Sequence, residues 1–277
     1  MAEGFDPAGL DRWTEESRFE VTRARLVEYA EATNDPVPAH RAGDVASPVF
    51  AIVPVFQSLL EPALEVVPTG LFGRVVHGEQ DFRFHRPIRP GDKLVSRAKM
   101  TGYEGLPNGT RGTVYLETRD EAGEPVNEQY VTLFVRGFDT GETRGVLGPD
   151  HRSAHSGAPA AKVAQHVDDD QTFRYAPAAG DPMPIHLDAE VARGAGLPGI
   201  IAHGLCTMAF ASWAVLTSVG ERRRLRRLAV RFAKPVLPGS DLDTTIWRAG
   251  DLAYAFETAV GDTVVLKDGL AEFTDQE

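Results

Sequence analysis

The segment 180–186 reads Gly-Asp-Pro-Met-Pro-Ile-His, and the segment 199–204 reads Gly-Ile-Ile-Ala-His-Gly. Two prolines stiffen the first segment, so Asp181 and His186 can face a single site. The second segment leads into an apolar run that predicts a buried helix whose first amide, at Gly204, has no partner within the helix. An acid, a histidine and a helix N-terminus can move protons and stabilise negative charge. These residues place the candidate functional site in the C-terminal half.

The chain contains an internal repeat. The segment 35–40, Asp-Pro-Val-Pro-Ala-His, resembles residues 181–186 at an offset of 181 − 35 = 146. The segment 84–91 resembles residues 232–239 at an offset of 232 − 84 = 148. Two matches in the same order and at nearly the same offset indicate a duplicated domain.

Domain boundaries follow from this repeat. The length of 277 residues is comfortable for two domains of ordinary size. Between the repeats, residues 141–165 are rich in small and polar residues and show no sustained helical or strand period. We therefore expect an N-terminal domain over residues 1–140, a linker over 141–165 and a C-terminal domain over 166–277.

Both halves are expected to begin with a helix and to continue with strands. Thr22 is a suitable N-cap for a helix that runs to Ala32, and the apolar run 50–64 predicts a second helix in the position that Gly204–Val219 takes in the other half. Alternating apolar residues predict strands around 82–84, 113–118, 130–135, 228–232, 254–260 and 263–266. This order is typical of an antiparallel sheet curled around one helix.

The composition excludes some classes of partner. The formal net charge is −11, so phosphate backbones would be repelled and we expect no nucleic-acid partner. Cys206 has no second cysteine for a disulfide, and residues 1–7 lack the regions of a secretory signal, which fits the cytoplasm. The run 200–219 is long enough to cross a membrane, but polar residues interrupt it. We expect a buried helix there and no membrane association.

The two quoted segments resemble a known family. Gly-Asp-Pro-Met-Pro-Ile-His followed by a His-Gly pair is similar to the pattern of the MaoC-like, R-specific enoyl-CoA hydratase (hydratase 2) family, which reads Gly-Asp-x-Asn-Pro-aliphatic-His and then His-Gly. The duplicated layout resembles the double-hotdog members of that family. The resemblance implies an α+β double hotdog: two antiparallel sheets, each wrapped around a central helix, fused in one chain.

The same resemblance implies a lyase, a 3-hydroxyacyl-thioester dehydratase or enoyl-CoA hydratase. Asp181 and His186 would be the catalytic dyad that holds the water, and the backbone N–H of Gly204 would bind the thioester oxygen. The chemistry agrees, because hydration needs a base for the water, an acid for the α carbon and a donor for the growing negative charge. With these groups no cofactor is expected; the substrate would be carried on coenzyme A or on an acyl carrier protein. No histidine or cysteine spacing suggests a metal site.

Two departures from the family pattern bear on activity. Met183 stands where the family has Asn, and a thioether is at best a weak hydrogen-bond acceptor. Asp35 and His40 keep the spacing of the dyad, but the counterpart of the His-Gly pair falls near Val53-Pro54, where proline offers no N–H. We therefore expect a degenerate N-terminal site in which Asp35 and His40 are structural.

Further residues are candidates for substrate contacts. Met183 and His203 lie beside the dyad motif, although His203 is also compatible with a buried core histidine. Cys206 lies in the apolar helix with no base partner, which favours a packing role. The basic run that begins with Arg222, Arg223 and Arg224 is either a solvated strand edge, a clamp for coenzyme A phosphates or a docking site for an acidic acyl carrier protein.

Two other functions remain open. A non-catalytic acyl-thioester-binding protein, or an inactive partner subunit of a dehydratase, would fit the presence of Met183. A hotdog thioesterase usually needs a carboxylate on its central helix; Gly204–Val219 contains none, whereas the N-terminal run contains Glu61. The sequence leaves open the acyl group, fatty acid or polyketide, as well as the carrier and the physiological direction. A homodimer is expected by analogy alone.

Overall fold

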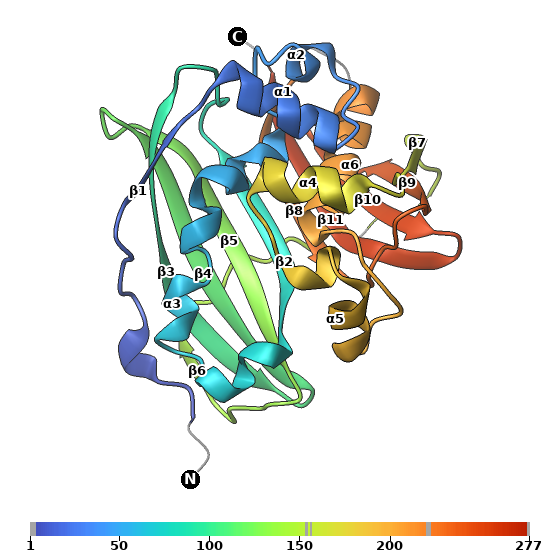
Figure 1. The fold of residues 1–277 in the computed structure, drawn as a ribbon. Coiled ribbons are helices and arrows are strands. Elements are labelled where there is room, and N and C mark those ends of the chain that lie inside the picture. Colours follow the sequence, from blue (N-terminus) through green and yellow to red (C-terminus); the bar gives the residue numbers. More distant parts are fainter. Residues whose placement is uncertain (1–3, 153–154, 156, 220–222, 276–277) are drawn as a thin grey trace. The chain divides into compact units, whose positions relative to one another are not determined.

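A computed structural model describes residues 4–152, 155, 157–219 and 223–275 (Figure 1). The chain forms two compact units, and each combines segments from different parts of the sequence. The first unit contains Met1–Phe19, Pro54–Arg86 and Lys93–Asp150, and the second contains Glu20–Val53, Pro87–Asp92 and His151–Glu277. This division differs from the boundaries expected at residues 140 and 166, because Glu20–Val53 packs with the C-terminal segment.

The first unit is built on a sheet with the strand order β1-β3-β4-β5-β2. Its strands are β1 (Ser17–Glu20), β2 (Val75–Phe84), β3 (Lys93–Leu106), β4 (Gly109–Asp120) and β5 (Pro125–Arg136), with β6 (Thr143–Gly145) paired to β3. The pairs β3–β4, β4–β5 and β2–β5 are antiparallel. Leu106 pairs directly with Gly109, so the turn between β3 and β4 contains two residues, the shortest common hairpin connection.

The apolar run expected as one helix over residues 50–64 is not a continuous α-helix. The structure has the 3-10 helix η2 (Pro48–Ser58) and then the short helix α3 (Glu61–Leu64). Pro54 lies inside η2, where its missing N–H and its ring are incompatible with regular α-helical hydrogen bonding. Two further 3-10 helices complete this part of the fold, η1 (Pro7–Gly9) and η3 (Thr69–Arg74).

The second unit has a sheet with the order β8-β11-β10-β9-β7, in which every neighbouring pair is antiparallel. Its strands are β7 (Ala161–His166), β8 (Arg223–Phe232), β9 (Asp241–Arg248), β10 (Ala253–Val260) and β11 (Thr263–Asp275). The helix α6 (Gly204–Val219) packs against β7, β8, β9 and β11 (Figure 1). Most of its side chains are buried, so the expected buried central helix is confirmed.

Among the described residues, five shorter helices lie entirely within the second unit: α1 (Arg23–Ala32), α2 (Pro38–Arg41), α4 (Gln171–Ala179), η4 (Pro184–His186) and α5 (Ala189–Gly194). The expected first helix is confirmed as α1, and the side chain of its N-cap Thr22 accepts a hydrogen bond from the N–H of Arg25 at 3.3 Å. No element was predicted over α4, which contains Pro177, a residue that disfavours a helix interior.

The segment 141–165, expected to be a linker without regular structure, contains β6 and most of β7. In β7 only Gln165 is buried, so the strand has no apolar alternation from which to predict it. The Gln165 amide donates to the Phe210 carbonyl at 2.6 Å and accepts from the Thr244 hydroxyl at 2.7 Å. These side-chain bonds add to the antiparallel pairing of β7 with β9 and hold the edge strand in place.

No helix within the described residues is long and apolar enough to cross a membrane.

Candidate active site

Asp181 is fixed at the end of α4. Gly180 has a φ of +74°, the left-handed conformation that ends helices and that glycine adopts at little cost. The backbone N–H of Asp181 then donates to the carbonyl of Ala176 at 3.0 Å. Its side chain folds back, and Oδ1 accepts the backbone N–H of Met183 at 3.2 Å. The carboxylate therefore takes its position from the last turn of α4.

His186 lies at the end of η4, the short turn that the two prolines of the motif initiate. Its ring Nδ1 is 2.8 Å from the carbonyl oxygen of Ile201. A carbonyl only accepts, so Nδ1 carries the hydrogen and Nε2 is left as an acceptor. This bond sets the tautomer that a general base requires.

The structure brings Asp181, His186 and His203 together. One oxygen or nitrogen of each side chain lies within 4.8 Å of the others. The rings of His186 and His203 stack with a centroid distance of 3.8 Å, and His203 Nε2 donates to the backbone carbonyl of Asp181 at 3.2 Å. All three side chains are buried. His203 thus holds both members of the predicted dyad in place.

Burial shifts both members of the dyad toward their neutral forms. It raises the pKa of the Asp181 carboxyl, an effect that the nearby His186 and the Met183 N–H partly offset. Burial also lowers the pKa of His186, and the Ile201 carbonyl and Asp181 partly offset this shift. The two pKa values approach each other, so moving a proton between the groups by way of a bound water costs less free energy than in water.

Gly204 supplies the helix N-terminus that the sequence predicted. It is the first residue of α6 and is exposed, and the first amides of an α-helix have no carbonyl partner within it. A Cβ at this position would lie 3.2 Å from the ring of Phe232, closer than side-chain contacts normally allow. Glycine therefore lets α6 begin close to Phe232, and its exposed first amide lies at the positive end of the helix dipole, where an anionic ligand atom is stabilised.

The three side chains do not form a good metal site, although each has an atom that could bind a metal ion. The rings of His186 and His203 stack nearly parallel, at 26°, so their in-plane lone pairs do not converge on one point. Carbonyl oxygens also engage one nitrogen on each ring. A structural or catalytic metal needs convergent ligands. The expected absence of a metal or cofactor stays a prediction.

The equivalent pair in the N-terminal repeat is arranged differently. His40 Nδ1 binds Asp35 Oδ2 directly at 2.7 Å, and the hydroxyl of Ser47 donates to the same oxygen at 2.6 Å. Asp35 Oδ1 accepts the N–H of Val37 at 2.9 Å. These partners occupy both carboxylate oxygens inside the protein, whereas Asp181 Oδ1 accepts the Met183 N–H and Asp181 Oδ2 lies 4.0 Å from His203 Nε2. The arrangement supports the structural role that we expect for Asp35 and His40.

Two other predicted residues take clear positions. Met183 is 44 % exposed, and its backbone N–H is the group that contacts the Asp181 carboxylate. Burial raises the pKa of the Cys206 thiol, which disfavours a nucleophilic thiolate and supports the packing role.

The basic run lies at the start of β8, and the other end of this strand lies next to Gly204. Arg222 is outside the described residues. Arg223, the first residue of β8, donates to the Asp251 carbonyl at 3.2 Å and to the Tyr254 hydroxyl at 2.9 Å, and Arg224 is exposed. Phe232, which lies against Gly204, is nine residues further along β8, about 30 Å in an extended strand. A role for Arg222, Arg223 and Arg224 in binding a carrier stays a prediction.

The sequence interpretation missed Tyr175. Its ring packs 4.9 Å from that of His203, and its hydroxyl lies 3.3 Å from the hydroxyl of Tyr29. The repeat contained the signal, because 175 − 29 = 146 is the offset that also relates Asp35 to Asp181.

Two sheets, each with helical segments, and a buried Asp/His site at the N-terminus of α6 define a double-hotdog protein. The family model described as "MaoC like domain" matches residues 150–268, and the one described as "FAS1-like, dehydratase domain region" matches residues 10–129. The chain belongs to the MaoC-like hydratase 2 family.

The matches to relatives and to a solved structure cover most of this chain. The 3-hydroxyacyl-thioester dehydratase Y of Mycobacterium tuberculosis is 29 % identical, over 97 % of this chain and 98 % of the relative. The probable enoyl-CoA hydratase 2 of Dictyostelium discoideum is 28 % identical over 75 % of each chain. A MaoC-like dehydratase from Phytophthora capsici superposes with a TM-score of 0.83 at 22 % identity, with 97 % of both chains covered. This likeness confirms the expected fold.

Replacing His203 by glutamine should flatten the pH dependence of stability in acid. Burial, aided by the nearby His186, lowers the pKa of His203 from 6.5 to about 3. Between pH 6.5 and about 3, His203 is therefore protonated in the unfolded chain and neutral in the folded protein. The unfolding free energy falls as pH drops below 6.5. The slope from this one group is about 1.4 kcal/mol per pH unit.

Urea unfolding of wild type and H203Q between pH 8 and about 4 measures this difference. Plotted against pH, the unfolding free energies of the two proteins should run parallel above pH 7. Below pH 6 they should converge, with a difference in slope that corresponds to one proton. Parallel curves throughout would show that His203 titrates normally.

Proposed function

We propose that the protein catalyses the reversible hydration of 2-enoyl thioesters to 3-hydroxyacyl thioesters. The observation that carries the proposal is the convergence of the Asp181 carboxylate and the free Nε2 of His186 beside the N-terminus of α6. A dyad of two buried acceptors binds one water, and an unpaired helix amide next to it binds the thioester oxygen. The membership in the MaoC-like family supports this reaction class.

The proposed mechanism uses one water. The dyad takes a proton from the water as its oxygen bonds to C3 of the enoyl group, and a proton passes from the dyad to C2. Negative charge collects on the thioester oxygen as an enolate forms, and the Gly204 N–H and the dipole of α6 stabilise it. The protonation state of the dyad at the end equals that at the start, and dehydration follows the same steps in reverse.

The direct test is a hydration assay with crotonyl-CoA that follows the loss of enoyl absorbance, repeated with longer and branched enoyl thioesters. We expect turnover that saturates with substrate. Saturable binding of every thioester without turnover would favour the acyl-thioester-binding protein or the inactive partner subunit instead. Release of free thiol without hydration would favour a thioesterase, but Glu61, the carboxylate on which that alternative depends, is exposed at the start of α3.

Replacing Met183 by asparagine, the residue of the family pattern, should change kcat/KM by less than about tenfold, because a lost or gained hydrogen bond at the edge of a site costs about 1 kcal/mol. The contact that Asp181 receives from this position comes from the backbone N–H, which any residue but proline provides. Steady-state kinetics of M183N and wild type with crotonyl-CoA measure the ratio. A gain of several orders of magnitude would show that Met183 disables the native site.

The finer assignments stay proposals. We propose coenzyme A or an acyl carrier protein as the carrier, a cytoplasmic location and a homodimer. The acidic net charge of −11 supports the expectation that nucleic acid is not a partner.

A further inference from the structure

The helices α1 and α4 take equivalent places in the two repeats and lie against each other in the second unit. Tyr29 and Tyr175, one repeat apart, are both buried and their hydroxyls lie within hydrogen-bond distance. Each helix ends two or three residues before the aspartate of its own repeat, Asp35 after α1 and Asp181 after α4. The helix pair therefore links the two aspartate loops.

Repeat-equivalent side chains bind the C-terminal end of the opposite helix. Gln171 Nε2 donates to the carbonyl of Ala32 at 2.6 Å, and Arg25 Nη2 donates to the carbonyl of Ala178 at 3.0 Å. The donors are 171 − 25 = 146 residues apart and the acceptors 178 − 32 = 146 residues apart. Arg25 Nη1 also donates to the carbonyl of Pro177 at 3.3 Å. These are helix-end carbonyls, which lack partners within their own helix.

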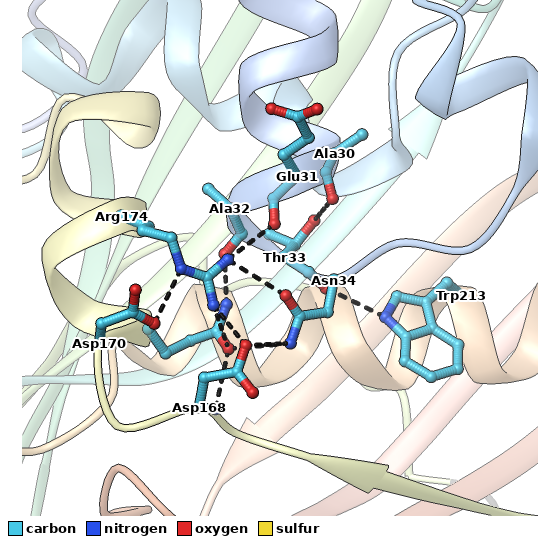
Figure 2. A network of polar contacts seen from close by, with 10 residues as sticks. Ala30, Glu31, Ala32, Thr33, Asn34, Asp168, Asp170, Arg174 and Trp213 are labelled. Carbon is cyan, nitrogen blue, oxygen red and sulfur yellow. Dashed lines mark hydrogen bonds and ion pairs between the residues drawn. The ribbon is translucent and has the colours of Figure 1, made fainter.

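The end of α1 carries a larger network than this single bond (Figure 2). Arg174 of α4 donates to the carbonyl of Glu31 at 3.0 Å and to the side-chain oxygen of Asn34 at 3.2 Å. From α6, Trp213 Nε1 donates to the carbonyl of Thr33 at 3.2 Å. Side chains from two helices thus hold the end of α1, whereas Arg25 is the side chain of α1 that holds the end of α4.

The end of α4 lacks part of the usual helical hydrogen bonding, so the bonds from Arg25 are important for holding it. Pro177 lies in its last turn and offers no N–H, so one helical hydrogen bond is missing there. The same turn contains Ala176, whose carbonyl accepts the N–H of Asp181 at 3.0 Å. A shift of this turn moves the carboxylate with it.

We propose that Arg25, a residue of the N-terminal repeat, is a positioning residue for Asp181, because it binds the carbonyls of Pro177 and Ala178 and so fixes the turn from which the catalytic carboxylate projects. The inference rests on the proposed function. The N-terminal repeat, whose own Asp35 is engaged by Ser47, thereby contributes to catalysis through its first helix.

The test compares R25A and R25K with R23A as a matched control. Arg23 lies on the same helix and also donates to a helix-end carbonyl, that of Ala42 at 2.6 Å, and to Asp44, but its contacts lead away from α4. We expect R25A to lower kcat for crotonyl-CoA about tenfold with a smaller change in KM, since a displacement below 1 Å suffices for such a loss. R25K should recover part of the loss, because lysine can reach one of the two carbonyls, and R23A should match wild type.

Two readouts separate positioning from general destabilisation. The limb of the pH profile that belongs to Asp181 should move to lower pH in R25A alone, since a looser loop admits water and relieves the burial that raises the pKa of Asp181. Hydrogen exchange of the peptide over residues 176–187 should accelerate in R25A and not in R23A, and this measurement needs no enzymatic activity.

The outcomes distinguish the inference from the function on which it rests. Wild-type exchange in R25A, or a kcat and pH profile in R25A equal to those of R23A, would overturn the positioning role. So would a loss of activity that equals the loss of folded protein seen by thermal unfolding. Absence of wild-type turnover together with faster exchange in R25A would remove the proposed reaction while leaving the mechanical coupling of Arg25 to the Asp181 loop in place.

Discussion

Replacing Asp181 by asparagine should lower kcat for crotonyl-CoA hydration by about three orders of magnitude, the size expected for the loss of a general acid–base group. Asparagine keeps an oxygen that accepts the Met183 N–H, so the loop geometry is retained while the carboxylate is lost. KM should change much less, because the site that we propose for the thioester oxygen lies elsewhere, at Gly204. Steady-state kinetics at pH 7 measure both constants.

The same substitution should raise the unfolding free energy at neutral pH. Burial raises the pKa of Asp181, so its contribution to stability is present below the unfolded value of 3.8 and is lost as pH rises through the folded value. At pH 7 the wild-type protein therefore carries the cost of a buried charge that the neutral amide lacks. Urea unfolding of D181N and wild type tests this, and a less stable, inactive D181N would show only that the variant misfolds.

Replacing His186 by alanine should reduce kcat by a factor of about 10²–10⁴. The Ile201 carbonyl holds the ring with Nε2 as the free acceptor, and alanine removes that acceptor. Because burial lowers the pKa of His186 below its usual 6.5, the wild-type rate should stay constant as pH falls to that value and decline only below it. The pH profile of H186A should lack this decline.

His40 supplies the matched control for His186. It is a buried histidine at the equivalent place of the other repeat, and it binds Asp35 directly. H40A should lose stability, because it leaves a buried carboxylate short of a partner, yet retain kcat within about threefold, as expected for a residue outside the reaction site. A collapse of kcat in folded H40A and not in H186A would reverse the assignment of the two sites.

The helices and strands that were predicted correctly are those that a short stretch of sequence specifies by itself. The helix after Thr22, the strands with alternating apolar residues and the buried helix after His203 are confirmed. The motif residues Asp181 and His186 were expected to face one site, and the structure brings their side chains together.

The parts that the sequence did not predict depend on long-range contacts. The strand β7 depends on its pairing with β9 and on bonds of Gln165, a polar residue that indicates no strand by itself. The helix α4 forms despite Pro177, and the helix expected over residues 50–64 is broken by Pro54, so the same residue type had opposite consequences in the two repeats. Tertiary packing decides such cases. The grouping of Glu20–Val53 with the C-terminal segment likewise has no local signal.

A side-by-side assay of wild type, D181N and D35N with crotonyl-CoA, at equal concentrations of folded protein, tests whether catalysis belongs to the C-terminal Asp–His pair and not to the N-terminal one. D35N should keep kcat within about threefold of wild type, while D181N should lose about three orders of magnitude. Equal losses in both variants, or a loss in D35N alone, would contradict the assignment to the C-terminal pair.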